Sequence, residues 1–230
     1  PLAIADNDNT YDYITVTSQG TVLDLNVAVD ITHSRTGDLR LILTGPTGSV
    51  SLLSDRNGGN GDNYTQTTFD DQATVTIKEG TPPYTGRFRP EMALSTFNNK
   101  PMNGTWTFRI NDGAINNTGT FNSWCLHFQF RDISSSAGYD KVSNKEVLSQ
   151  NYPNPTQGIT NIEFTLDKPE DISLAVYNHF GQEVAMLAKG RYEAGNHLIV
   201  AGLKNLSSGR YVYRLITGNG VFSKPLVIVK

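Results

Sequence analysis

The stretch Asn103–Phe128, NGTWTFRINDGAINNTGTFNSWCLHF, is the part of the chain most indicative of its fold class, and it contains both tryptophans and the only cysteine. Two runs within it alternate apolar with polar residues, which places each apolar set on one face of a pleated sheet. The apolar members are Trp106, Phe108 and Ile110, then Phe121, Trp124, Leu126 and Phe128. Asn and Gly residues between the runs favour a turn, so the stretch predicts one β-hairpin. Large aromatic side chains bury on the order of 150–250 Å² each, and we expect this hairpin to anchor a core.

The composition places the chain among all-β proteins. It has 230 residues, enough for two domains, and its 21 Gly and 10 Pro go with many turns and no long helical period. A net charge of −3 with 18% charged residues gives no reason to expect a nucleic-acid partner. No apolar run approaches the roughly 20 residues of a membrane span. Because the chain starts at Pro1 without Met or a signal peptide, we expect it to be a fragment of a longer protein.

Short alternating runs separated by turns fill the first half of the chain. Strands are predicted at Tyr11–Val16, Val22–Ile31, Leu39–Leu43 and Val50–Leu53, with a short one at Val75 and Ile77. The interval Gly80–Pro90, which contains two adjacent prolines, is predicted to be irregular. This spacing of strands favours a jelly-roll β-sandwich over residues 1–131.

The alternating pattern stops after Arg131 and resumes near Val147. Residues 132–146 include Ser134–Gly138, a composition typical of a flexible linker. About seven short runs then occupy residues 147–230, which predicts a second, smaller immunoglobulin-like β-sandwich.

Five motifs in the first half, taken in order, resemble the P domain of proprotein convertases. They are Ile31–Leu39, Leu43–Gly48, Phe69–Asp71, Asn103–Trp106 and Gly119–Trp124. The resemblance covers about residues 1–131 and implies a jelly-roll sandwich that follows and stabilises a subtilisin-like protease domain. In bacteria such domains also follow other secreted enzymes, metalloproteases included. The resemblance therefore implies a catalytic domain upstream of Pro1 as the partner, and it assigns any hydrolytic chemistry to that neighbouring domain.

The second half resembles the type A C-terminal sorting domain of the type IX secretion system of Bacteroidetes-type bacteria. The motifs are Asn151–Pro155, Gly158–Leu166, Val176-Tyr177 with Gly181, Leu206–Tyr211 and Lys224–Lys230. Within them the sorting-signal residues are Asn151, Pro153, Pro155, Gly181, Gly209, Tyr211, Lys224 and Lys230. The resemblance implies a secreted or cell-surface protein whose partners are the type IX translocon and its signal peptidase. Two positions depart from the family pattern: Thr156 replaces a usual Phe, and Pro225 interrupts the last strand, which suits an edge or a bulge.

The sequence offers no evident catalytic set. No Gly-x-Ser-x-Gly elbow occurs, and the histidines lack metal-ligand spacing. His33 is interpreted as bonding the Arg35–Asp38 turn, with a metal or substrate contact as the alternative. Cys125 is interpreted as a strand thiol rather than a nucleophile.

Calcium is the one cofactor for which the sequence offers candidate ligands. The loop Asp55–Asp62 superficially suggests a calcium site, although it fails the EF-hand template and a plain solvated loop is favoured. The alternative is a structural Ca²⁺ held by some members of an acidic set. That set is Asp38, Asp62, Asp70, Asp71 and Asp112.

Two functions of different classes follow. The favoured one is the non-catalytic C-terminal region of a secreted hydrolase, for which a subtilisin-like serine protease is expected. The alternative is an accessory module that binds a polymer such as collagen or polysaccharide. Tyr11, Tyr13, Tyr64 and Tyr84 are the aromatics that could form such a binding row.

Overall fold

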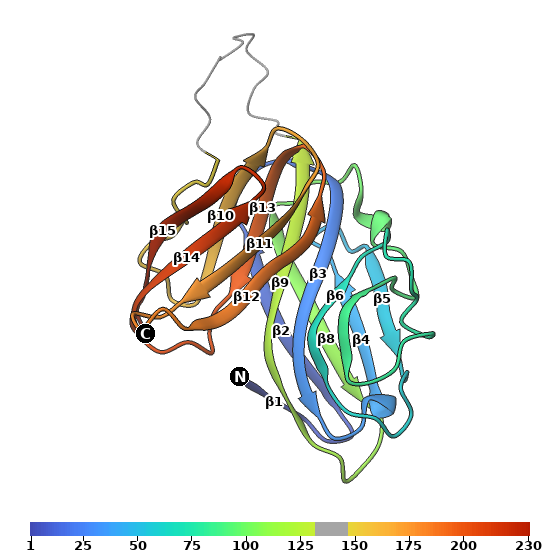
Figure 1. The fold of residues 1–230 in the computed structure, drawn as a ribbon. Helices are drawn as coiled ribbons and strands as arrows, with labels where there is room; N and C mark the ends of the chain where they lie inside the picture. Colours follow the sequence, from blue (N-terminus) through green and yellow to red (C-terminus); the bar gives the residue numbers. More distant parts are fainter. Residues whose placement is uncertain (132–146) are drawn as a thin grey trace.

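The computed structural model describes residues 1–131 and 147–230, and these residues form a nearly all-β protein, as predicted (Figure 1). The first range contains β1 Leu2–Ile4, β2 Asn9–Val16, β3 Thr21–His33, β4 Leu39–Thr44, β5 Val50–Asp55, β6 Tyr64–Phe69, β7 Tyr84–Phe88, β8 Gly104–Asp112 and β9 Gly119–Arg131, with 3₁₀ turns η1 Thr36–Asp38 and η2 Leu94–Phe97. The second range contains β10 Ile159–Leu166, β11 Glu170–Tyr177, β12 Glu183–Tyr192, β13 Gly195–Gly202, β14 Gly209–Thr217 and β15 Gly220–Ile228. The linker predicted at 132–146 lies outside the described residues. Within those residues, no helix is long and apolar enough to cross a membrane.

The first part of the chain is a sandwich of two sheets. One sheet has the order β2-β8-β4-β5, and the other includes β9-β3-β6-β7. Along β8, inward-facing buried residues alternate with outward-facing ones, as in a half-buried strand, whereas Trp124–Phe128 on β9 are all buried. Trp106 on β8 and Trp124 on β9 are both almost fully buried between the sheets.

The predicted hairpin over Asn103–Phe128 is wrong, because β8 and β9 belong to opposite sheets. Their aromatic faces meet across the core instead of lying side by side in one sheet. The ring of Phe108 lies 5.0 Å from that of Phe121 and 5.3 Å from that of Trp124. Alternation identifies the apolar face of each run, and two wide aromatic faces bury each other when they stack face to face across a sandwich.

Two smaller predictions in the first half are also wrong. The interval Gly80–Pro90 is not irregular throughout, because it contains β7, which pairs with β6 in parallel. The prolines end just before β7 begins, so they do not remove ladder hydrogen bonds from it, and Tyr84 stacks on Tyr64 with ring centroids 4.9 Å apart. Val75 and Ile77 form no strand, since that segment contributes only an isolated bridge between Thr76 and Arg89.

The second part of the chain forms a smaller, immunoglobulin-like sandwich, as predicted. The sheet β12-β11-β14-β15 packs over β10 and β13. Strand β13 also pairs with β9 of the first sandwich, which produces one continuous sheet of order β10-β13-β9-β3-β6-β7, with β1 on β9 (Figure 1). The two sandwiches therefore share a sheet, a feature that the sequence analysis did not foresee.

Candidate functional site

The segment that opens the second sandwich is held by a buried asparagine. Asn151 donates its backbone N–H to the Tyr213 hydroxyl at 2.7 Å. Its side-chain amide donates to Thr160 Oγ1 at 2.8 Å and to the Pro153 carbonyl at 3.1 Å. Pro153 and Pro155 both follow cis peptide bonds. The Asn-x-Pro-x-Pro motif thus has a structural explanation: the buried Asn151 amide ties the Pro153 carbonyl to Thr160 in a segment that forms no regular strand.

This opening segment closes the outer edge of the last strand. Asn154 Oδ1 accepts the Val227 N–H at 2.8 Å, and Asn154 Nδ2 donates to the Pro225 carbonyl at 3.1 Å. The backbone of Thr156 continues the contact by pairing with Val227 and Val229. Strand β15 is the edge of its sheet, so Pro225 is tolerated there, in agreement with the expectation from the sequence. Sequence analysis missed the role of Asn154, although its place in the proline motif could have suggested it.

Thr156, the departure from the family pattern, is fully buried. Its hydroxyl donates to the Ile159 carbonyl at 2.5 Å and accepts the Gly158 N–H at 3.1 Å. A polar side chain is therefore accommodated at this position by local hydrogen bonds that satisfy it.

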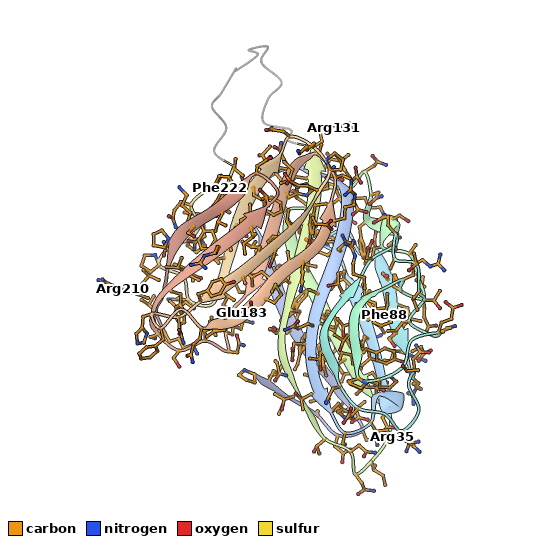
Figure 2. All side chains as sticks on the ribbon, in the orientation of Figure 1. Arg35, Phe88, Arg131, Glu183, Arg210 and Phe222 are labelled. Atoms are coloured by element: carbon orange, nitrogen blue, oxygen red, sulfur yellow. The ribbon has the colours of Figure 1, made fainter. Side chains whose placement is uncertain are left out.

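Of the other predicted sorting residues, Gly181, Gly209, Tyr211 and Lys230 lie toward the end of the second sandwich where β14 begins, whereas Lys224 lies in the middle of its sheet. Gly181, with φ of +77°, lies in the turn between β11 and β12, and the pairing of Tyr177 with Val212 brings that turn beside the start of β14. Gly209 opens β14 opposite Ile228. The Tyr211 hydroxyl donates to the Ser207 carbonyl at 2.9 Å, and the Lys230 N–H donates to Ser208 Oγ at 3.0 Å. Lys224 lies opposite Tyr213 in the sheet. Figure 2 shows Arg210 at this end of the sandwich.

The buried polar cluster of the first sandwich is structural. His33 Nδ1 lies 2.9 Å from the Arg35 carbonyl, and His33 Nε2 lies 3.3 Å from Asp112 Oδ2. Both side chains are completely buried, so no substrate reaches them. The interpretation of His33 as bonding the Arg35–Asp38 turn is confirmed by this geometry. Arg35 marks this end of the molecule, opposite Arg131 (Figure 2).

The structure does not bring the five predicted calcium ligands into one site. Asp38, the last residue of η1, accepts from Asn117 Nδ2 at 2.8 Å, and Asp112 pairs with the next residue, Leu39. Asp70 accepts from Arg87 Nε at 2.7 Å, and Asp71 accepts the N–H groups of η2. Asp62 is exposed. Within residues 1–131 and 147–230, no three His, Cys, Asp or Glu side chains gather as a metal ion requires, and calcium stays a prediction.

The four tyrosines considered for polymer binding do not form one row. Tyr64 and Tyr84 are completely buried in the first core. Tyr11 and Tyr13 are 43% and 51% exposed on the outer face of β2, two residues apart. Only these two remain available on the surface.

Both halves of the chain match known families, in the order predicted from the motifs. Residues 22–128 match the model of the proprotein convertase P-domain, and residues 150–229 match that of the secretion system C-terminal sorting domain. The chain therefore contains a P domain followed by a sorting domain.

Individual relatives match only part of their own length. The chain is 33% identical over 102 residues to Leupeptin-inactivating enzyme 1 of Streptomyces exfoliatus, covering 44% of this chain and 18% of that protein. The crystal structure of the Aeromonas sobria serine protease with its chaperone ORF2 superposes with a TM-score of 0.34 at 17% identity, covering 88% of this chain and 24% of that one. The serine protease of Aeromonas sobria without the chaperone gives 0.33 and 16%, covering 87% and 24%. At these TM-scores the superpositions establish no shared fold.

Proposed function

We propose that this chain is the non-catalytic C-terminal region of a secreted protease. In this proposal the P domain stabilises a subtilisin-like serine protease domain upstream of Pro1, and the sorting domain directs export through the type IX system. The observation that carries it is the order of the two matched domains, a P domain at 22–128 and a sorting domain at 150–229. The sorting domain itself indicates export to the cell surface or the medium.

The geometry of the second sandwich supports its role as an address. The opening segment of the domain, through Asn154 and Thr156, is hydrogen-bonded to β15, its last strand, so the two ends of the domain sequence lie together. An address made of such contacts exists only when the domain is folded and the last strand is docked. Removing Val221–Lys230 would uncover the edge of β14 and the core around Leu226 and Ile228, so we expect it to abolish export.

A fusion experiment separates the address from the rest of the protein. Residues 141–230 are joined to an unrelated periplasmic reporter in a host that has the type IX system. We expect the reporter on the cell surface or in the medium, and in the periplasm when the fusion ends at residue 220 or when the host lacks the translocon. A reporter that stays periplasmic while circular dichroism shows a folded sorting domain would contradict the proposal.

The catalytic part of the proposal has its own test. The sequence upstream of Pro1 should encode a protease domain, and that domain should lose activity on heating at a lower temperature without residues 1–131 than with them. An upstream region without a protease domain would rule out this part and leave the address intact.

Exposed Tyr11 and Tyr13 favour a second candidate, a polymer-binding role for the P domain. The two residues lie on one face of an edge strand, where their exposed rings could contact a ligand such as collagen or polysaccharide. The unchanged chain should then be retained on insoluble collagen or polysaccharide in a pull-down, and changing both tyrosines to Ala should abolish this retention. Equal retention of the variant and the unchanged chain would exclude this candidate.

A further inference from the structure

Strand β9 of the P domain has an edge that two other strands share. β3 pairs with one edge of β9 along its whole length. On the opposite edge, β1 covers only Gly119–Phe121, and β13 of the sorting domain covers Cys125–Gln129. Without β13, a row of backbone N–H and C=O groups in the middle of a buried sheet would lose its partners.

Side chains cross between the two cores at this junction. Leu198 and Val200 point from β13 into the core of the P domain and are completely buried there. Cys125 points from β9 into the core of the sorting domain, where Ala28 of β3 also packs. Each domain therefore supplies apolar groups that the core of the other domain contains.

Polar contacts surround this apolar junction. His127 Nδ1 lies 2.8 Å from the Tyr192 hydroxyl, with both groups buried. The other contacts are Lys204 Nζ to Asp12 Oδ1, 2.5 Å, Gln129 Nε2 to the Ala194 carbonyl, 3.1 Å, and Arg87 Nη1 to the Arg191 carbonyl, 3.3 Å. Such a junction combines strand addition with a desolvated apolar centre and a polar rim, the features of a specific protein–protein interface.

We propose that the edge of β9 is a binding site for β13, which holds the sorting domain on the P domain independently of the covalent connection between them. Cutting the chain between Arg131 and Val147 then leaves a non-covalent complex. Release of the sorting domain requires a second event that separates β13 from β9 and opens that edge to another strand. This inference does not depend on the export route or on the identity of the upstream domain.

The test uses the chain 1–230 with a site for a specific protease inserted between Arg131 and Val147. After complete cutting, we expect the two fragments to elute together in size-exclusion chromatography at micromolar concentration. Burial raises the pKa of the Cys125 thiol to about 12, and Cys125 is the only cysteine, so maleimide labelling reports directly on the junction. Cys125 should stay as protected after cutting as before it. Separate elution of two folded fragments with rapid labelling would overturn the proposal.

Variants of β13 test whether this strand makes the contact. Leu198→Asp places a charge in the P-domain core and not in the sorting-domain core, so the cut fragments should separate while circular dichroism shows both still folded. Leu198→Ala is the milder variant, for use if Leu198→Asp prevents folding, and should raise the dissociation constant about tenfold or more. Val221→Asp, at an exposed position of β15, is the matched control and should leave the association of the fragments unchanged. If the two cut fragments of each Leu198 variant bind each other as tightly as the unchanged fragments do, β13 does not make the contact that holds the domains together.

Discussion

His127 should make the stability of this protein depend on pH between about 7 and 5. The imidazole lies on β9 at the junction of the two domains, is only 3% exposed, and contacts the Tyr192 hydroxyl. Burial lowers its pKa to about 3, whereas histidine in an unfolded chain has a pKa of about 6.5. Burial also lowers the pKa of the neighbouring His197.

The sign and size of the effect follow from proton linkage. Above about pH 6.5 His127 is neutral in both the folded and the unfolded chain, and its contribution to stability is fully present. Between that pH and about 3, the unfolded chain binds a proton that the folded chain does not, so stability falls as the pH falls. From pH 7.5 to pH 5 this difference amounts to about 2 kcal/mol for His127 alone. His197 acts in the same direction.

Urea unfolding at pH 7.5 and pH 5 measures the effect. His127→Phe should lower stability at pH 7.5, since the Tyr192 hydroxyl loses its partner, yet it should lose about 2 kcal/mol less between the two pH values than the unchanged chain. His179→Gln is the matched control, because His179 is exposed, and it should keep the full pH dependence. If His127→Phe keeps the same pH dependence as the unchanged chain, the reasoning about its buried neutral state is refuted.

Three further predictions address the contact of Asn154 with β15, the core of the P domain and calcium. Asn154→Ala removes two hydrogen bonds to β15, including the one from Val227, and should lower the stability of the sorting domain by about 1–3 kcal/mol in urea unfolding; an unchanged midpoint would show that this contact does not stabilise the domain. Phe108→Ala deletes the ring that contacts Phe121 and Trp124 and should lower the free energy of unfolding by about 3–5 kcal/mol. A decrease under about 1 kcal/mol would show that this ring is not central to the core. A calcium site predicts that chelation lowers the melting temperature by several degrees, since ligand at about 100 times its dissociation constant adds roughly 2.7 kcal/mol; identical melts with chelator and with millimolar Ca²⁺ would retire it.

Short motifs in the sequence predicted the two families and their order, because each motif contains residues that few local structures accept. Gly181 adopts positive φ in its turn, and the buried side chain of Asn151 bonds the Pro153 carbonyl of the proline segment. The turn interpretation of His33 was confirmed for the same reason, since its partner lies two residues away. Local chemistry of this kind is readable without knowledge of the rest of the fold.

The partners of the acidic residues could not be predicted from local sequence. Five aspartates suggested calcium ligands, but a carboxylate is equally suited to accept hydrogen bonds from Arg87, from Asn117 or from the N–H groups of η2. Which of these partners it meets depends on segments distant in the chain. The same holds for the tyrosines, since Tyr64 and Tyr84 stack in the core while Tyr11 and Tyr13 face solvent.

The amino-acid sequence was sufficient to predict the all-β class, the buried face of most strands and the families of the two domains. Alternation with a period of two identifies a face, because successive side chains point to opposite sides of a strand. It does not identify the neighbouring strand, since backbone hydrogen bonds are the same for every residue pair. Only the tertiary structure placed β8 and β9 in opposite sheets and joined β9 to β13 across the two domains. The pairing of strands depends on which apolar faces pack together without leaving cavities, and this is decided only in the assembled cores.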